Sequence, residues 1–390
     1  MDSRLSIKRH LKEIPFPLEV QEVMASIRAL GGDVYVVGGA LRDWCWRPAP
    51  FNGAAIDWDL TTNLSPSVLR QLSQRYHPGE AFGTYRLGSH IEATIMRREG
   101  RYSDSRHPDK IIPAESLRVD LSRRDFRVNA LAFDGQRLEG VKGALSDLRD
   151  RVMRAVGDPL RRFQEDPLRM VRFVRFLGVL GAKADPATWE AMHDNRSLIQ
   201  KVSRERRLGE FVKFLQSPFE RWSLWSKAGM NLALDWPLPQ KPFVAFIKSP
   251  SHPAGQIAAY RLFSCGSLEG LSSWLGQWPL PSSWRQGLTA LLTTSYQFDP
   301  DLWAQKARSP QAPYGWIFRD LALAAGVAEN DLDPIAVALS PHDLQNDWGL
   351  HGPRLGAAWR YLAHLAAQHP EINSRALLTP YLNAWLNQQP

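Results

Sequence analysis

Asp57 and Asp59 are separated by a single residue in the apolar run Ile-Asp-Trp-Asp-Leu. Successive side chains of a strand point to opposite faces, so both carboxylates project to the same side if this run is a strand. Hard oxygen ligands at this spacing suit one or two Mg²⁺ ions that also bind substrate phosphates. A solvated edge strand would carry the same pair without function, so the pair alone leaves both interpretations open.

A glycine pair lies upstream of these acids. Gly38 and Gly39 directly follow the β-rich run at residues 34–37, and Arg42 and Asp43 come next in an expected helix start. Glycines at such a turn allow backbone N–H groups to approach a phosphate. A tight strand-to-helix turn would use the same residues, but the acidic pair that follows favours a phosphate site.

Further charged residues lie in two segments downstream. Glu92 interrupts the apolar run IEATIM, where it is either a third metal carboxylate or an edge residue in water. Arg123, Arg124 and Asp125 precede an alternating apolar segment. Arg124 could clamp a phosphate and Asp125 could accept a hydrogen bond from a ribose hydroxyl. An ordinary surface charge run is the alternative.

A helical segment carries the last candidate site. Asp166, Arg169, Arg172 and Arg175 recur at intervals of three, and apolar residues occupy the other face. A carboxylate acceptor and a guanidinium with several donors, one turn apart, can hydrogen-bond to the Watson–Crick edge of a base. The alternative to a base-binding site is an Asp–Arg ion pair on a solvated helix. Three arginines in one stripe would, however, repel each other unless an anion lies nearby.

The elements that must position these residues predict an α+β fold. Short β-rich runs at residues 34–37, 55–60, 85–87, 91–96 and 128–133 predict a small sheet. From Asp158 the periodicity becomes helical, with Asp158 and Pro159 as N-cap and first helical residue. Helices are expected from there to the end, many of them short and joined by proline-containing turns.

Composition narrows the class of protein. The 390 residues have a formal net charge of +8, and nearly all of this excess lies in residues 1–220, which points to a phosphate-bearing partner. Cys45 and Cys265 are the only cysteines, which excludes a disulfide framework and a cysteine zinc cage. Without a signal peptide or a long apolar run, we expect a cytoplasmic protein that does not enter the membrane.

Taken in order, the motifs over residues 30–215 resemble those of class II tRNA nucleotidyltransferases. These are the CCA-adding enzymes, which share ancestry with bacterial poly(A) polymerases in the polymerase-β-like nucleotidyltransferase superfamily. The motifs are VVGGALRD, IDWDLTT, IEATIMRREGRYSDSRHPD, RRDFRVNAL, LSDLRDRVMRAVGDPLRRF, EDPLRMVRFVRF and SRERRLGEFVKFL.

The resemblance implies an α+β nucleotidyltransferase head with a small β-sheet, followed by an all-α neck, body and tail. We expect the catalytic head at residues 1–137 and the base-selecting neck at 138–215. The helical body would then take residues 216–300, and the tRNA-binding tail 301–390.

The resemblance also assigns roles to residues. Asp57 and Asp59 would bind two catalytic Mg²⁺ ions, with Glu92 as the third carboxylate. The remaining assignments concern the bound nucleotide. Its triphosphate, sugar and base would be held by Gly38, Gly39, Arg42, Asp43, Arg124, Asp125, Asp166, Arg169, Arg172 and Arg175. The expected substrates are CTP, ATP and tRNA, held through its acceptor and TΨC arms, and the expected state is a monomer.

Three departures from the family pattern stand out. Arg127 replaces the usual Thr and is either near the nucleotide or on an outward face. The segment at residues 44–56 is longer than usual, and Arg106-His107-Pro108 replaces Arg-Arg-Pro.

Full CCA addition is the favoured activity. Addition of A alone, addition of CC alone, a poly(A) polymerase and an inactive RNA-binding paralogue are the alternatives. The dipeptide His342-Asp343 resembles an HD phosphohydrolase motif, but its proline-rich, histidine-poor surroundings argue against such a site.

Overall fold

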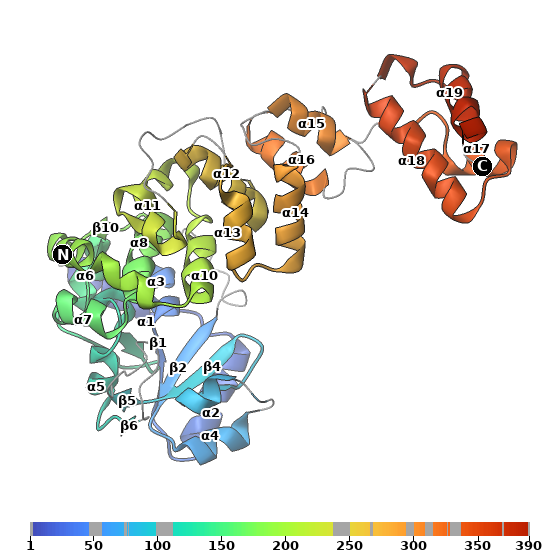
Figure 1. The fold of residues 1–390 in the computed structure, drawn as a ribbon. Coiled ribbons are helices and arrows are strands. Elements are labelled where there is room, and N and C mark those ends of the chain that lie inside the picture. The colour runs from blue at the N-terminus through green and yellow to red at the C-terminus, as the bar shows by residue number, and fades with distance from the viewer. Residues whose placement is uncertain are drawn as a thin grey trace. The chain divides into compact units, whose positions relative to one another are not determined.

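The computed structural model describes residues 3–46, 57–73, 76, 78–98, 112–236, 250–265, 268–293, 300–308, 315–325, 327, 337–368 and 370–388 (Figure 1). The chain forms two compact units, Met1–Glu210 with Ala228–Trp236, and Phe211–Lys227 with Pro237–Pro390. The expected α+β class is confirmed, with all strands of the six-stranded sheet in the first unit.

A mixed six-stranded sheet forms the centre of the first unit, in the order β3-β4-β2-β1-β7-β8. Its strands are β1 (Val34–Val37), β2 (Trp58–Thr62), β3 (Thr84–Arg86), β4 (Ile91–Ile95), β7 (Leu131–Phe133) and β8 (Leu138–Gly140). Strands β2 and β4 pair in parallel, and the other neighbours pair antiparallel. In Figure 1 β2 and β4 lie side by side, as this pairing requires.

The strand register brings the acidic residues together. Asp59 lies opposite Val37, the last residue of β1, and beside Glu92 of β4. The Gly-Gly turn therefore begins next to the acidic strand, because β1 ends there. Strands β5 (Arg97–Arg98) and β6 (Ile112–Pro113) form a separate antiparallel pair.

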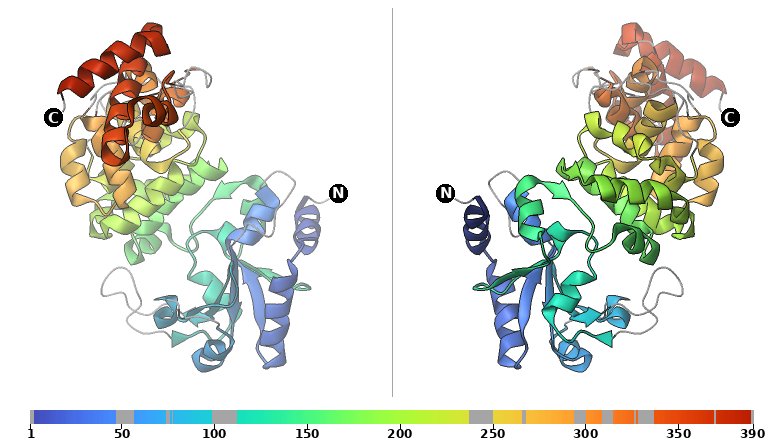
Figure 2. Two further views of the ribbon diagram at one scale, coloured as in Figure 1. Left: turned by 90° about the vertical axis from the view of Figure 1, so that its right-hand side faces the viewer. Right: turned by 90° about the vertical axis from the view of Figure 1, so that its left-hand side faces the viewer.

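Helices cover the sheet. The longest nearby helix, α2 (Leu18–Ala29), runs alongside the strands in Figure 2 and buries Val20, Met24 and Ile27. A core cluster includes Val37 and Ala132 of the sheet and Leu117 and Leu121 of α5 (Leu117–Ser122). Burying these side chains fixes α5 beside β1, with the Arg123-Arg124-Asp125 segment directly after it. The other helices of the sheet region are α1 (Ser3–Lys12), α3 (Gly39–Trp46), α4 (Pro66–Leu72), η2 (Pro78–Phe82) and α6 (Ala144–Asp150).

The strand expected at residues 128–133 is wrong in its first half. Residues Arg127–Asn129 form a 3₁₀ turn, η3, and the strand begins only at Leu131. The turn closes through hydrogen bonds from the N–H groups of Asn129 and Ala130 to the carbonyls of Phe126 and Arg127. The strand expected at residues 34–37 is present with these bounds, and the other expected strands are present with shifted ends. Residues 55 and 56 lie outside the part of the chain that the structure describes.

The expected continuous helix from Asp158 is interrupted. Asp158 caps α7 (Pro159–Glu165) as expected, since its carboxylate accepts a hydrogen bond from the Leu160 N–H at 3.0 Å. The chain then leaves the helix at Asp166, whose backbone is extended because Pro167 follows, and α8 (Leu168–Leu180) begins after it. Asp166 is therefore not on the helix that carries Arg169, Arg172 and Arg175. The prediction that all four residues form one stripe on a single helix is wrong.

Aromatic side chains form the core around α8. Phe173 packs on Phe126, Phe163 and Trp189, with ring centroids 5.7, 6.4 and 6.3 Å apart. The accompanying elements are β9 (Val152–Met153), β10 (Lys183–Ala184), α9 (Pro186–Asn195), η4 (Arg196–Lys201), α10 (Arg204–Phe214) and η6 (Met230–Leu234).

In its described residues the second unit consists of helices joined by turns and has no strand, as expected. Its elements are η5 (Phe219–Arg221), α11 (Ser223–Lys227), α12 (Pro253–Cys265), α13 (Leu271–Gln277), α14 (Ser282–Leu292), α15 (Pro300–Arg308), α16 (Gly315–Ala324), α17 (Pro341–Trp348), α18 (Gly352–Gln368), η8 (Pro370–Ile372) and α19 (Arg375–Gln388). Leucines of α17, α18 and α19 share one core cluster. Among the described helices, none is long and apolar enough to cross a bilayer.

The His342-Asp343 pair has a structural role. Asp343 forms a capping box with Ser340 at the start of α17 and pairs with Arg375 of α19. His342 contacts Asn346 one turn later. The carboxylate is thus committed to the helix end, which agrees with the argument against a phosphohydrolase site.

Candidate active site

The turn between β1 and α3 forms one side of the candidate site. Gly38 has a φ of +75°, a conformation that L side chains rarely adopt. A Cβ there would lie 3.3 Å from Arg124 Nη1 and 3.5 Å from Asp59 Oδ2. The absence of a side chain therefore lets a guanidinium and a carboxylate approach the same turn from the segments after α5 and in β2.

Asp57 and Asp59 both reach the pocket that this turn borders. Asp57, just before β2, lies with Oδ1 3.2 Å from His90 Nδ1. Desolvation by the surrounding protein raises the pKa of Asp59, the Arg124 guanidinium lowers it, and the Glu92 and Asp57 carboxylates raise it again. The net pKa is above the usual value, so a cation between these acids would relieve their repulsion.

The pocket has a volume of about 390 Å³ and belongs to the first unit. Its charged and polar lining combines arginines with carboxylates around the glycine turn. The lining residues are Gly38, Gly39, Ala40, Arg42, Asp43, Asp57, Asp59, Arg124, Asp125, Asn129, Arg172, Arg175 and Phe176. Ten of the thirteen expected site residues therefore line one pocket.

Arg42 is buried in the floor of the pocket, 6% exposed. Its guanidinium donates to Asp43 Oδ1 at 2.8 Å and to Asn129 Oδ1 at 2.6 Å. Asn129 in turn donates to Asp125 Oδ1 at 3.1 Å. The 3₁₀ turn η3 thus connects the arginine of α3 to Asp125.

Asp125 is saturated with donors. Its Oδ1 accepts from Asn129 and from the Phe126 N–H, and its Oδ2 accepts from Arg172 Nε at 2.9 Å and Nη2 at 2.7 Å. Burial alone would raise the pKa of Asp125, but Arg172 and Asn129 outweigh it and hold the pKa well below its usual range. A ribose hydroxyl would have to displace one of these donors.

Three guanidiniums surround the ring of Phe176. The Cζ atoms of Arg42, Arg172 and Arg175 lie 4.8, 5.4 and 3.9 Å from its centroid. Glu210 of α10 balances this charge, pairing with Arg175 at 2.5 Å and with Arg172 at 3.7 Å. The positive side of the pocket is thus fixed before any anion binds.

Arg124 reaches the pocket from the opposite side. Its Nη2 lies 3.4 Å from the buried carboxylate of Asp120, while Nη1 lies at the Gly38 turn. Among the described residues, none offers a hydrogen-bond acceptor to its Nε. Asp120 was not anticipated from the sequence, and nothing in its spacing distinguishes it from a surface acid.

Three expected site residues do not belong to the described lining of this pocket. Glu92 lies beside Asp59 in the sheet but pairs with Arg86 at 3.0 Å. Asp166 pairs with Arg206 at 3.3 Å. Arg169 is buried and donates to Glu165 at 2.9 Å and to the Arg123 carbonyl at 3.1 Å.

Ala40, Asn129 and Phe176 line the pocket but were not predicted from the sequence. Asn129 lies four residues after Asp125 within the motif RRDFRVNAL, so a helical turn there would have predicted their contact. Phe176 follows Arg175 directly and resembles an ordinary core residue.

One of the three departures can be placed fully and a second in part. Arg127 is not among the described residues that line the pocket and lies 3.7 Å from Asp147, so it has a structural ion-pairing contact. Of the long segment at residues 44–56, only Trp44, Cys45 and Trp46 are described, as the end of α3. Arg106-His107-Pro108 lies outside the described residues.

The acidic pair fits a divalent cation that shares its coordination with a substrate. Among the described residues, no three His, Cys, Asp or Glu side chains gather into a closed metal cage. Mg²⁺ usually keeps several waters and binds one or two carboxylates together with phosphates. Asp57 and Asp59 at the edge of an arginine-rich pocket offer that kind of site.

Replacing Gly38 by alanine is expected to weaken binding of inorganic tripolyphosphate by about tenfold, or about 1.4 kcal/mol. The new Cβ would lie 3.3 Å from Arg124 Nη1, so this guanidinium would have to shift away from the turn. Gly31→Ala is the matched control, because Gly31 has a φ of +81° and no atom within 4 Å of the Cβ position. Titration calorimetry with tripolyphosphate checks this, and equal losses in both variants would contradict it.

Two known domain families match segments of the chain. A family model described as the poly A polymerase head domain matches residues 34–154. A second, described as the probable RNA and SrmB-binding site of polymerase A, matches residues 183–224. Among solved structures, the Bacillus stearothermophilus CCA-adding enzyme in complex with CTP aligns with a TM-score of 0.65. That alignment has 23% identity and covers 96% of this chain and 99% of the other. The expected polymerase-β-like head followed by helices is therefore confirmed as a fold.

Curated relatives show the family. The CCA-adding enzyme of Lactobacillus helveticus is 35% identical over 56% of this chain and 55% of its own length. The match thus spans about half of that relative. The CCA-adding enzyme of Streptococcus suis is 32% identical over 71% of both chains. With this extent of similarity and the shared fold, the chain belongs to the family of CCA-adding enzymes.

Proposed function

We propose that the chain is a template-independent tRNA nucleotidyltransferase that adds C, C and A to the 3′ end of tRNA from CTP and ATP. Pyrophosphate is the second product. The observation that carries this proposal is the single pocket in which the glycine turn, two adjacent carboxylates and four arginines meet.

The positive residues of the pocket bind the triphosphate. The backbone at Gly38 and Gly39 offers N–H groups, and the Arg124 Nη1 edge lies against the same turn. Arg172 and Arg175 are held by Asp125 and Glu210, so their charges are placed without reorganisation when the nucleotide arrives.

Asp57 and Asp59 hold Mg²⁺ in this proposal, and Glu92 supports them from the neighbouring strand. The chemistry that Mg²⁺ would supply there is Lewis acidity, which would lower the pKa of the tRNA 3′-hydroxyl, and positive charge to balance the departing pyrophosphate. The two acids align the reacting groups because they lie at one edge of the triphosphate pocket.

Asp166 and Arg169 select the base in this proposal. Both side chains form ion pairs in the structure, Asp166 with Arg206 and Arg169 with Glu165. These ion pairs must break before the two side chains can hydrogen-bond to the base of CTP or ATP. Selection by side chains suits an enzyme that works without a template.

The proposed work is divided along the chain. The head at residues 1–137 carries the chemistry, and the neck at 138–215 selects the nucleotide. The body at 216–300 and the tail at 301–390 hold the acceptor and TΨC arms of tRNA by shape and phosphate contacts. We place the reaction in the cytoplasm and the enzyme as a monomer.

Extension of three tRNA substrates tests the proposal. Transcripts ending at the discriminator base, at C and at CC are incubated with CTP, ATP or both, with Mg²⁺ or with EDTA. We expect the shortest substrate to be completed to CCA only when both nucleotides and Mg²⁺ are present.

Each other outcome identifies a different function. Extension of the CC-ended substrate alone would show A addition, and a stop after two C residues would show CC addition. Long A tails on unrelated RNA would show a poly(A) polymerase. Binding of tRNA without any extension would show an inactive RNA-binding paralogue.

A further inference from the structure

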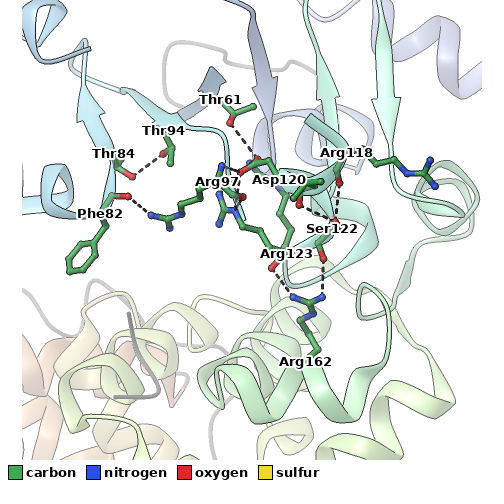
Figure 3. Close-up of polar contacts among 12 residues, drawn as sticks. Thr61, Phe82, Thr84, Thr94, Arg97, Arg118, Asp120, Ser122, Arg123 and Arg162 are labelled. Atoms are coloured by element: carbon green, nitrogen blue, oxygen red, sulfur yellow. Dashed lines mark hydrogen bonds and ion pairs between the residues drawn. The ribbon is translucent and has the colours of Figure 1, made fainter. Parts of the chain in front are cut away.

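The carboxylate of Asp120, which lies beside the pocket, is contacted by several donors. Asp120 is 0% exposed, and donors approach it from several elements of the first unit. Arg123 Nε lies 2.9 Å and Arg123 Nη2 2.8 Å away, and the Arg97 N–H lies 3.2 Å away. Thr61 Oγ1 and Arg124 Nη2 complete the set at 3.4 Å each. Figure 3 shows Asp120 among Thr61, Arg97 and Arg123.

Two of these contacts lead directly to the pocket. Arg124 uses Nη2 for Asp120 and has Nη1 at the Gly38 turn, so Asp120 holds one edge of the guanidinium and the other edge reaches the turn. Thr61 lies two residues after Asp59 on β2, so both side chains are on the same face of the strand. Asp120 therefore connects the phosphate-side arginine to the strand that carries the acidic pair.

A third contact leads to the expected base-selecting residue. Asp120 fixes the side chain of Arg123, whose Nε also donates to the Arg97 carbonyl at 3.1 Å. The Arg123 carbonyl then accepts from Arg169 Nη2 and from Arg162 Nη1, both at 3.1 Å. In Figure 3 Arg162 reaches the carbonyls of Ser122 and Arg123 from α7. Arg162 and Arg169 thus donate hydrogen bonds to carbonyls at the C-terminal end of α5, where the helix dipole favours positive charge.

Asp120 stays ionised in this setting. Burial alone would raise the pKa of its carboxyl, but Arg123, Arg124 and the Arg97 N–H outweigh burial and lower the pKa below its usual value. The charge is therefore fixed across the neutral pH range and is balanced by arginines that lie beside the active site.

We propose that Asp120 is a positioning residue for the nucleoside triphosphate. It holds the Arg124 guanidinium in the pocket, and by fixing Arg123 it also holds the backbone carbonyl that accepts a hydrogen bond from Arg169. It does not touch the substrate itself. This inference rests on the proposed nucleotidyl transfer, because it assigns Arg124 to the triphosphate.

Asp120→Asn tests the proposal, because asparagine keeps the shape but loses the charge that holds both arginines. We expect the KM for CTP and for ATP to rise together by about 10- to 100-fold, the loss typical of a charge-assisted hydrogen bond, with a smaller change in kcat. Binding of inorganic tripolyphosphate, measured by calorimetry, is expected to weaken by a similar factor because the contact concerns the phosphates.

Asp185→Asn is the matched control. Asp185 is also a buried acid of the first unit, 7% exposed, and lies 3.3 Å from Arg154 outside the pocket lining. It is expected to lower the melting temperature without changing the KM for either nucleotide. A rise in KM as large as that of Asp120→Asn would overturn the positioning role.

A double variant tests the path through Arg124. If Asp120 acts through this arginine, the losses from Asp120→Asn and Arg124→Gln do not add, whereas independent sites would give additive losses. Additive losses, or an unchanged KM in Asp120→Asn, would overturn the proposal.

Arg123→Lys is the second variant, in case Asp120→Asn does not fold. It keeps the balancing charge but cannot hold both contacts to Asp120, so a severalfold rise in KM is expected, and an unchanged KM would overturn the proposal. The binding measurements with CTP and tripolyphosphate do not need tRNA. A wild-type protein that binds both but fails to extend tRNA would contradict the proposed function and leave this comparison intact.

Discussion

Replacing Asp59 by asparagine is expected to lower the rate of nucleotide incorporation by at least about a thousandfold, which corresponds to about 4 kcal/mol. The substitution keeps the shape of the side chain but removes an anionic oxygen, and a neutral amide is a poorer ligand for a hard divalent cation. The pocket carboxylates Asp43 and Asp125 cannot take over, because Arg42 and Arg172 already hold them. Single-turnover addition of A to a CC-ended tRNA measures the loss.

The affinity for tRNA is the second readout of this variant. Asp59 lies in the nucleotide pocket, so filter binding of tRNA is expected to change by less than about twofold. Asp33→Asn is the matched control next to the same sheet, because Asp33 directly precedes β1 and contacts Asn63 at 2.9 Å. Asp59→Asn activity within about tenfold of wild type would contradict the metal assignment.

Glu92→Gln is a graded comparison within this experiment. Glu92 lies beside Asp59 but pairs with Arg86 and is not among the described residues that line the pocket. A direct third ligand would give a loss as large as that of Asp59→Asn, whereas a supporting role would give a smaller one. The assignment of Glu92 can therefore be decided alongside that of Asp59.

Period-two alternation in one strand and a glycine pair after another were enough to predict the acidic edge of the pocket. Both signals are local: Asp57 and Asp59 differ by two positions, and Gly38 needs its positive φ whatever surrounds it. The sequence could not show that β1 and β2 pair so that Val37 lies opposite Asp59. That register arises from tertiary packing, and it turns two local motifs into one pocket.

The helical side of the site was predicted less well because a backbone break interrupts it. Spacing of three suggested one stripe from Asp166 to Arg175, but Pro167 forces the preceding residue out of the helix. Arg172 and Arg175 do reach the pocket, while Asp166 and Arg169 make contacts outside its described lining. The proline was visible in the sequence and gave the signal that the stripe could not be continuous.

The supporting residues were beyond sequence reasoning for a different reason. Asp120 acts on arginines that lie three and four positions away, and Asn129 acts on Arg42, which is 87 positions away. A buried acid and a surface acid look alike in one sequence, because only the folded chain shows which arginines surround it. The network that preorganises the pocket is therefore a result of the structure.

Arg172→Met is expected to lower the free energy of unfolding of the first unit by about 2 kcal/mol at pH 7. Removing one partner of a fully buried ion pair typically costs about 3–5 kcal/mol, because the other charge stays buried and unpaired. Here the cost is smaller, since Arg172 is 33% exposed and Asp125 keeps the hydrogen bond from Asn129. Glu210 keeps Arg175.

The dependence of this loss on pH follows from the pKa of Asp125. In the wild type that pKa is lowered, so the pair contributes stability above the unfolded value of about 4, and the contribution is lost as pH falls through the folded pKa. In Arg172→Met the largest cause that lowers this pKa is removed, and we expect burial to outweigh the remaining donors and to raise the folded pKa of Asp125 above the unfolded one. Protonation then stabilises the folded variant, so the difference from wild type shrinks toward pH 4.

Calorimetric melting from pH 4 to pH 8 measures both the size and the pH dependence of this loss. Arg70→Met is the control, because Arg70 is half exposed and its pair with Glu80 is worth less than about 1 kcal/mol. Its effect is expected to be small and to remain small across this range. A loss in Arg172→Met that stays constant or grows toward acid pH would mean that Asp125 is not left as an unpaired buried charge. The stabilisation would then come from packing of the arginine stem on Phe176, whose ring centroid lies 5.4 Å from Arg172 Cζ.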